Sequence, residues 1–159
     1  MACYCDLDHF KPYNDVYGYR RADEVIHWTG ELLRDCCAGD LDFLGHIGGD
    51  DFMVVFRSAD WEERCRTLLA AFEVGRNRFF CDEDLARGGY LGEDRARKLV
   101  LHPLLSLSVG AVRSRPGLFQ SHHELSAAAA VAKKEAKREE GSVLFVERRN
   151  PHPAASLAM

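Results

Sequence analysis

Residues 41–56 read LDFLGHIGGDDFMVVF, and no other segment constrains the architecture as strongly. Two runs rich in β-forming residues, 41–47 and 52–56, flank the four residues GGDD at 48–51. Glycines and aspartates between such runs are typical of a tight hairpin. A hairpin in the middle of the chain excludes a purely parallel doubly wound sheet, so the sequence predicts a mixed sheet.

The flanking segments predict further strands and helices around this hairpin. Apolar runs predict three more strands, at residues 1–7, 101–112 and 143–146. Apolar residues at helical spacing predict helices over residues 23–37 and 61–80, and a capping box of Ser121 and Glu124 opens a helix that extends to residue 140. The charged segment 81–98, with Gly88 and Gly89, is predicted to be a loop or a small excursion.

The resulting order, β-α-β-β-α-β-α-β, predicts the fold class. It is an α/β (α+β) fold with a mixed central sheet of about five strands flanked by helices. The length of 159 residues fits one domain. We expect that domain over residues 1–149 and a loose C-terminal tail over residues 150–159, which contain two prolines.

Composition and charge limit the partners of the chain. A formal net charge of -4 argues against sequence-blind binding of DNA or RNA, which usually needs a basic face. No run approaches the roughly 18 apolar residues of a membrane span, and no signal peptide opens the chain. We therefore expect no nucleic acid partner, no membrane contact and a cytoplasmic location. The six cysteines form no CxxC pair, which favours free buried thiols, with a zinc site as the minor alternative.

Aspartates cluster where the first predicted strand ends and in the hairpin turn. Asp6 and Asp8 are two residues apart and therefore lie on one face of a strand. If the hairpin pairs beside that strand, Asp50 faces Asp6 at a strand spacing of about 5 Å. Carboxylates that converge repel one another unless a cation or proton joins them, and Mg²⁺ prefers such oxygen ligands. The alternative is that these aspartates only cap turns and helices, and the residues alone leave both readings open.

Four segments resemble motifs of one family. The stretch DLDHFKPYND at residues 6–15, with Gly18 and Asp23, resembles the first motif of GGDEF domains, and GGDDF at 48–52 resembles their signature loop. The segment LSLSVGA at 105–111 is similar to a later strand of the family, and Ala136-Lys137 to the alanine-lysine pair near its last helix. The four segments occur in the family's order, so the chain is identified as resembling a GGDEF (diguanylate cyclase) domain.

This resemblance implies a fold, an activity and a metal site. The fold is similar to the palm of nucleotide cyclases and polymerases. The activity is condensation of two GTP into cyclic di-GMP with release of pyrophosphate, across a transient antiparallel homodimer. The implied cofactor is Mg²⁺, with Mn²⁺ as an alternative. Its implied ligands are Asp6, the backbone carbonyl of Leu7 and Asp50, and the implied catalytic residues are Asp50, Asp6, Lys11 and Asp51.

The resemblance also implies how GTP binds. Asn14 and Asp23 match the pair that reads guanine, although Asn14 can equally be a helix or turn cap. Backbone amides of His9 and Phe10, together with Lys11, are expected to cradle phosphates at a helix start. The remaining implied substrate contacts are Gly48, Gly49 and Lys137. From the residues alone, Lys133, Lys134 and Lys137 are as readily a solvated helix face.

Four positions depart from the family pattern. Asp51 replaces the usual glutamate and is shorter by one methylene, and His46 stands where arginine is common. Gly141 stands where an arginine usually binds phosphate. Gly39 removes the arginine of the arginine-x-x-aspartate inhibitory site, whose aspartate would be Asp42, so we expect no product inhibition there.

The departures support a second reading of the function. In it the chain is a catalytically weak or inactive GTP-binding module that regulates an attached phosphodiesterase (EAL) domain. The absence of the phosphate-binding arginine at Gly141 and the shorter Asp51 favour this reading. Family domains normally begin with a helix before the first strand, so we expect this sequence to be a fragment of a longer protein. The charged segment between residues 80 and 98 resembles a branch of the family fused behind EAL domains. A purely structural interaction domain is the third reading, and the retained metal and base-reading positions disfavour it.

Overall fold

The computed structural model describes residues 1–94 and 96–149, so the predicted tail at 150–159 lies outside the described residues. The strands are β1 (Ala2–Asp8), β2 (Phe43–Gly48), β3 (Asp51–Val55), β4 (Gly89–Glu93), β5 (Leu99–Pro103), β6 (Ser106–Val112) and β7 (Val143–Glu147). The α-helices are α1 (Phe10–Tyr17), α2 (Tyr19–Cys36), α3 (Trp61–Gly75), α4 (Asp82–Arg87) and α5 (His122–Ala136). Short 3-10 turns occupy Gly39–Leu41 and Arg76–Phe79.

The central sheet has five strands in the order β2-β3-β1-β6-β7. Strand β1 lies in the middle and pairs antiparallel with β3 and with β6, while β6 and β7 are parallel. The β2-β3 hairpin is antiparallel, with an irregular register between His46 and Gly48. The predicted mixed sheet of about five strands, flanked by helices, is confirmed.

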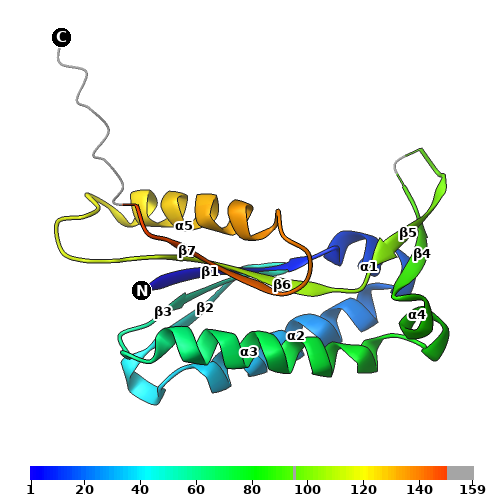
Figure 1. Cartoon of the computed structure of the whole chain (residues 1–159), viewed down its shortest axis with the longest axis horizontal. Coiled ribbons are helices and arrows are strands. Elements are labelled where there is room, and N and C mark those ends of the chain that lie inside the picture. The colour runs from blue at the N-terminus through cyan, green and yellow to red at the C-terminus, as the bar shows by residue number, and fades with distance from the viewer. Residues whose placement is uncertain (95, 150–159) are drawn as a thin grey trace, which may run out of the picture.

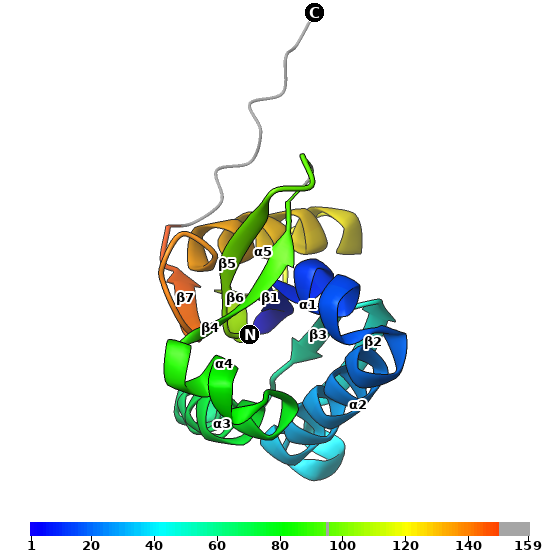
Figure 2. The same ribbon diagram turned by 90° about the vertical axis from the view of Figure 1, so that its right-hand side faces the viewer.

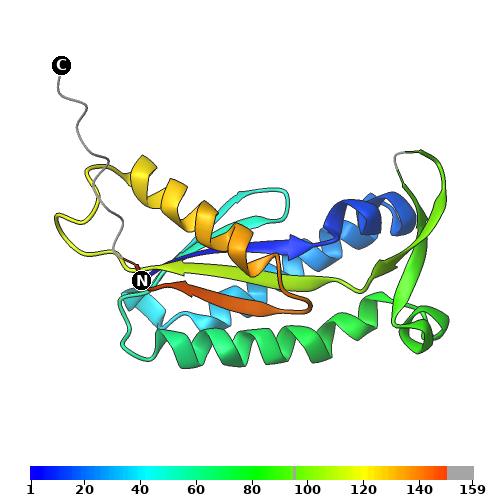
Figure 3. The same ribbon diagram turned by 45° about the horizontal axis from the view of Figure 1, so that its top comes forward.

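Helices cover both faces of this sheet, α2 and α3 on one face and α5 on the other (Figures 1 and 3). Alternate residues of β1 point to opposite faces, because successive side chains of a strand alternate. Cys3, Cys5 and Leu7 belong to the large core cluster that also contains α2 and α3 residues. Ala2 and Tyr4 belong to a smaller cluster with Ala129 and Ala132 of α5, so Asp6 and Asp8 lie on the α5 face by the same alternation.

Helix α5 approaches the sheet very closely at Gly110 of β6. A Cβ atom added at Gly110 would lie 2.1 Å from the backbone nitrogen of Lys133. The side chains at the contact are small, since Ala129, Ala132 and Ala136 are buried. This close approach brings the lysines that follow Ala132 and Ala136 over the end of β1.

Residues 81–98, predicted to be a loop or a small excursion, form an excursion with regular secondary structure. They contain helix α4 and strand β4, and β4 pairs with β5 as a separate two-stranded hairpin. That hairpin stands beside α1 and beyond the end of the main sheet (Figure 1), and in Figure 2 it lies in front of the sheet. Its inner side is anchored by the fully buried ring of Tyr90, which stacks at an angle with His102. Strand β4 was not predicted, because only one of its sides is buried and the surrounding sequence is rich in charged residues.

The single strand predicted over 101–112 was also wrong, because the chain passes from the hairpin into the main sheet there. Strand β5 ends at Pro103, and β6 begins at Ser106. Proline cannot donate to a strand ladder, so it marks the end of regular pairing. The helix predicted over 61–80 ends at Gly75, and α5 ends at Ala136.

The capping box and most of the thiol prediction are confirmed. Ser121 Oγ accepts a hydrogen bond of 3.2 Å from the backbone nitrogen of Glu124. All six cysteines are free. Cys3, Cys5, Cys36 and Cys65 are buried, Cys37 is half-buried and Cys81 is exposed. Burial raises the pKa of Cys5, as expected for thiols that act as small apolar side chains.

Candidate functional site

Three carboxylates meet at the end of the central strand. Asp6 and Asp8 lie on the α5 face of β1, and both are at least nine-tenths buried. The register places Asp51 directly opposite Asp6 on β3. The expectation that Asp50 faces Asp6 was therefore wrong, because β3 begins at Asp51 and Asp50 remains in the turn.

Two lysines of α5, one helical turn apart, neutralise these carboxylates. Lys133 Nζ lies 2.7 Å from Asp6 Oδ2 and 2.9 Å from Asp51 Oδ1. Lys137 Nζ forms an ion pair with Asp6 Oδ1 and lies 3.2 Å from Asp8 Oδ1. The lysines are therefore more than a solvated helix face, whereas Lys134 between them is exposed.

Asp8 is also held by two hydroxyl groups of β6. Ser106 Oγ donates to Asp8 Oδ2 at 3.0 Å, and Ser108 Oγ donates to the same oxygen at 2.6 Å. Both serines are buried. Hydrogen bonds to an ionised acceptor are stronger than neutral ones, so these hydroxyls hold the Asp8 carboxylate in position. Both serines belong to the segment LSLSVGA at 105–111, but no role was predicted for them, because a buried serine on a strand gives no signal for its partner.

Burial and charge act against each other in this cluster. Burial raises the pKa of Asp6, and the ion pairs with Lys133 and Lys137 oppose that rise. The pKa of Lys133 is raised to about 12, because its partners Asp6 and Asp51 outweigh the effect of burial. Burial, followed by the charge of Asp6, raises the pKa of Asp50. Asp50 thus belongs to the same electrostatic cluster although it is not the strand partner of Asp6.

The chain turns sharply between β1 and α1. His9 adopts a left-handed conformation with φ 59°. Its carbonyl accepts from the Tyr13 backbone nitrogen at 3.1 Å and from the Tyr90 hydroxyl at 3.0 Å. The hairpin strand β4 therefore fixes the turn that carries the start of α1 at Phe10. Burial lowers the pKa of the His9 imidazole.

A cavity of about 850 Å³ opens beside this turn. Asp8, His9 and Lys137 line it on the side of the carboxylate cluster. Arg138 and Gly141 line it beyond the end of α5. Gly141, which stands at the family's arginine position, therefore faces a space that both cationic and acidic side chains border.

Asn14 and Asp23 lie on adjacent helices. Asn14 is on α1 and Asp23 is exposed on α2, and these two helices pack against each other. The Asn14 Oδ1 atom is buried and accepts no hydrogen bond from the residues that the structure describes. A buried polar atom without a partner is costly, so this atom is suited to a ligand. Because Oδ1 accepts no hydrogen bond from these residues, the Asn14 side-chain oxygen does not cap a helix.

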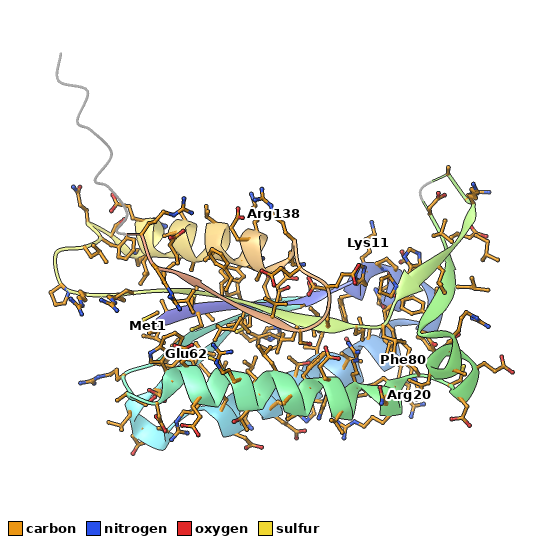
Figure 4. All side chains as sticks on the ribbon, in the orientation of Figure 1. Met1, Lys11, Arg20, Glu62, Phe80 and Arg138 are labelled. Carbon is orange, nitrogen blue, oxygen red and sulfur yellow. The ribbon has the colours of Figure 1, made fainter. Side chains whose placement is uncertain are left out.

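Lys11 is exposed on α1. Figure 4 shows it projecting on the side of the molecule where α5 lies and where Arg138 also projects. Arg138 itself pairs with Glu135 at 2.6 Å. Lys11 is therefore placed near the end of the sheet that carries the cluster, without belonging to the ion pairs within the described chain.

The glycine turn is held by His46. Its Nε2 lies 2.8 Å from the carbonyl oxygen of Gly49 and donates to it in the Nε2–H tautomer, while its ring stacks on Phe52. Gly48 and Gly49 both have positive φ, and no atom lies within 4 Å of a Cβ added at either position. The glycines thus serve the backbone conformation and leave open space above it.

Asp42 has a different, internal set of partners. Its carboxylate accepts from the backbone nitrogens of Ala38 at 2.8 Å, Arg57 at 2.7 Å and Ser58 at 3.0 Å. It also accepts from the Ser58 hydroxyl at 3.0 Å. These bonds connect the loop before β2 to the loop after β3, so Asp42 is committed to holding the base of the hairpin.

Residues 1–94 and 96–149 contain no group of three or more His, Cys, Asp or Glu side chains already arranged around a metal position. In the same residues no helix combines the length and apolar character needed to cross a bilayer. The carboxylate oxygens at the end of β1 are instead engaged by ammonium groups.

Comparison with known proteins agrees with this geometry. Residues 1–77 match the sequence model of the family described as diguanylate cyclase, GGDEF domain. The chain is 32% identical over 75 residues to the probable diguanylate cyclase DgcI of Escherichia coli and 33% identical over 74 residues to a diguanylate cyclase of Vibrio cholerae. Each alignment covers 46% of this chain but only 17% and 22% of the two relatives, so the chain spans about a fifth of their length.

The fold is shared over more of the chain than the sequence is. The GGDEF domain of PA1120 (YfiN or TpbB) from Pseudomonas aeruginosa superposes with a TM-score of 0.65 at 20% identity, covering 94% of this chain and 82% of that one. At that identity the likeness concerns the fold. Residues 1–77 therefore belong to the GGDEF family, and the chain as a whole has the fold of a GGDEF domain.

Proposed function

We propose that the chain is a diguanylate cyclase domain, which condenses two GTP molecules into cyclic di-GMP and releases pyrophosphate. The observation that carries the proposal is the cluster of Asp6, Asp8 and Asp51 with two lysines, set beside a cavity of about 850 Å³. This arrangement provides anionic ligands for a cation and cationic groups for phosphates within one site. The diguanylate cyclases to which part of the chain is similar suggest the reaction type.

The phosphate groups of GTP fit the cavity side of the cluster. The first backbone N–H groups of a helix have no partner within the helix, so His9 and Phe10 can donate to phosphate oxygens there. Lys137, which lines the cavity, can exchange its carboxylate contacts for a phosphate, and Lys11 can add a second positive charge. Gly48 and Gly49 leave room for a nucleotide above the hairpin turn.

The residues present are suitable for a divalent ion, and Mg²⁺ is the proposed one, with Mn²⁺ as an alternative. The donors would be one oxygen of Asp6, the carbonyl of Leu7 and Asp50, all hard oxygen ligands of the kind that Mg²⁺ prefers. Asp6 fits this role, because its carboxylate is buried and is held by two lysine side chains, which can move. When bound, the ion would polarise the α-phosphate and lower the pKa of the attacking hydroxyl.

The base would be read by the two residues on α1 and α2. The unpartnered Oδ1 of Asn14 can accept from an N–H of guanine, and the carboxylate of Asp23 can accept from N1–H and the exocyclic amine. Adenine carries no N1–H, so Asp23 would disfavour it. This division of roles requires the base to lie between α1 and the exposed side of α2.

In the reaction, the 3′-oxygen of one GTP forms a bond to the α-phosphorus of another, and the bond to pyrophosphate breaks. Asp50 is proposed to accept the proton of the 3′-hydroxyl, either directly or through a water molecule. Each domain holds one GTP, so two domains must face each other antiparallel. The isolated domain would therefore turn over faster at high protein concentration.

The alternative function is a GTP-binding module that regulates an attached phosphodiesterase. Two observations favour it over the cyclase. Gly141 provides no side chain at the cavity, and Asp51 is held 2.9 Å from Lys133 instead of being free to reach a nucleotide. Such a module keeps Asn14, Asp23 and the metal ligands without turnover.

Chromatography of nucleotides after incubation of concentrated protein with GTP and Mg²⁺ tests the proposal. The wild-type chain should produce cyclic di-GMP, and Asp50→Ala should not. Asp40→Ala is the matched control, because Asp40 is an exposed aspartate near the base of the same hairpin. Unchanged GTP with the wild-type chain, together with retained GTP binding by calorimetry, would support the regulatory module and count against the cyclase.

A further inference from the structure

Lys133 occupies an enclosed position among the site carboxylates. Its side chain is 14% exposed, and its Nζ lies 4.1 Å from the centre of the Tyr4 ring. The same Nζ lies within 3 Å of oxygens of Asp6 and Asp51, which face each other across β1 and β3. The absence of a side chain at Gly110 allows the backbone of Lys133 to approach the sheet this closely. The position of the ammonium group is therefore fixed by the packing of α5.

The positive charge of Lys133 compensates the negative charges of Asp6 and Asp51. Two carboxylates directly opposite on neighbouring strands repel each other, and an ammonium group between them removes that repulsion. A divalent cation at Asp6 would do the same with twice the charge. The two cations cannot both make full use of the Asp6 carboxylate, because they repel each other at such short distances.

We propose that Lys133 is an internal cation that competes with the divalent metal ion for Asp6. Metal binding moves the Lys133 ammonium off Asp6, and Asp51 retains it as the second partner. The inference rests on the proposed metal site at Asp6 and adds to it a residue that sets the affinity of that site. It also gives Asp51 a role that its shorter side chain can fill, as the anchor of the displaced lysine.

Binding of Mn²⁺ alone, without nucleotide, tests this inference. The loss of the free Mn²⁺ signal in electron paramagnetic resonance reports binding directly. Lys133→Met removes the charge and keeps most of the length, so it should bind Mn²⁺ about tenfold more tightly than the wild type. A charge at this range changes the binding of another cation, the proton, by about 10- to 1000-fold, and solvent lowers the effect here.

Two further variants control for the change of side chain. Lys134→Met makes the same substitution at the next, exposed residue of α5 and should leave Mn²⁺ affinity unchanged. Lys133→Arg keeps the positive charge and should bind Mn²⁺ no more tightly than the wild type. Lys133→Gln provides a second neutral variant if Lys133→Met folds poorly, and Mn²⁺ should raise the melting temperature of either neutral variant more than that of the wild type.

The result that would overturn the inference is an Mn²⁺ affinity of the neutral variants that is equal to or lower than that of the wild type, including no binding by any of them. Lower affinity would mean that Lys133 orients Asp6 for the metal. Failure of the cyclase proposal is distinguishable from this. Tighter Mn²⁺ binding without cyclic di-GMP would refute only the cyclase, and cyclic di-GMP with unchanged Mn²⁺ affinity would refute only the role of Lys133.

Discussion

The two faces of the central sheet differ in what they bury, although the same strands build both. The face under α2 and α3 is lined by large apolar side chains such as Leu7, Phe52 and Leu107, all nearly inaccessible to solvent. The face under α5 carries a smaller apolar cluster at one end, which includes Ala2, Tyr4 and Val112, and Asp6, Asp8 and two serines at the other end. Strand alternation produces this separation, because every second residue of β1 and β6 points to the α5 side.

The difference indicates how one small sheet combines stability with a charged site. The apolar face can supply most of the hydrophobic free energy, since burial of large apolar side chains is the dominant favourable term in folding. The α5 face then tolerates buried carboxylates, provided that lysines and hydroxyls satisfy them. Substitutions on the apolar face should therefore mainly change the free energy of unfolding. Substitutions on the other face should also change the contacts that α5 makes with the sheet.

The largest effect is expected on the apolar face. Phe72 of α3 is fully buried and its ring stacks on Trp28 with centroids 5.1 Å apart. Phe72→Ala should lower the free energy of unfolding by about 4 kcal/mol, through lost burial and the cavity left behind. Urea unfolding followed by circular dichroism measures this change. Val74→Ala on the same helix is the control, because Val74 is 76% exposed and should change stability by less than about 0.5 kcal/mol.

If both variants lose similar stability, the apolar face is not the main source of folding free energy. That result would contradict the proposed difference between the two faces. A loss confined to Phe72→Ala supports it.

A smaller but still large effect is expected where α5 meets the sheet. Gly110→Ala would place a methyl group 2.1 Å from the backbone nitrogen of Lys133, so α5 must shift away. We expect a loss of about 2–3 kcal/mol from overpacking, accompanied by weaker ion pairs of Lys133. Thermal and urea unfolding measure the loss.

Gly30→Ala is the matched control on the other side of the sheet. Gly30 lies in α2, and a Cβ atom there would be 3.6 Å from the Phe52 ring, an ordinary contact. Alanine in a helix should stabilise by about 0.5–1 kcal/mol because it restricts the unfolded chain. Opposite signs for the two glycines would show that close approach is a property of the α5 face alone, and equal signs would contradict it.

Most of the architecture was predictable from the sequence, for a physical reason. The hairpin at 48–51, the capped helix after Ser121 and the central strands have local signals, since turn residues and periodicity act within a few positions. The β4-β5 hairpin was missed because its buried contact, Tyr90 with His9 and His102, comes from residues distant in sequence. Its exposed side carries charged residues and the leucines Leu99 and Leu101, which do not pack into the main core. The pattern of apolar residues therefore did not indicate a separate hairpin.

The candidate site was predictable in outline and incomplete in detail. Motifs indicated Asp6, Asp50 and Lys137, but β3 already begins at Asp51, so the register pairs Asp51 with Asp6 and leaves Asp50 in the turn. Lys133 was considered only as one of several surface lysines. Its spacing of four residues before Lys137 was the available signal, because residues at i and i+4 share one helix face.

Asp6 and Asp42 show how the site face differs from a carboxylate with a structural role. Asp6 is held by lysine side chains, which can move, whereas Asp42 is held by backbone N–H groups, which cannot. Burial alone would raise the pKa of Asp42, but the hydrogen bonds from Ala38, Ser58 and Arg57 outweigh it and lower that pKa to about 2. Stability from Asp42 should therefore depend on pH without any dependence on metal or nucleotide.

Asp42→Asn is the smallest effect of the series and tests that distinction. The folded-state pKa of about 2 lies below the ordinary value of 3.8, so the stabilisation is complete above that value and is lost as pH falls toward 2. At pH 7 the variant should be less stable than the wild type by about 1.5 kcal/mol, the scale of hydrogen bonds to a charged acceptor. The difference should shrink toward zero near pH 2 in urea unfolding, and added Mn²⁺ should not change it. A difference that stays constant with pH, or that Mn²⁺ alters, would place Asp42 with the site carboxylates and remove the distinction between the hairpin base and the α5 face.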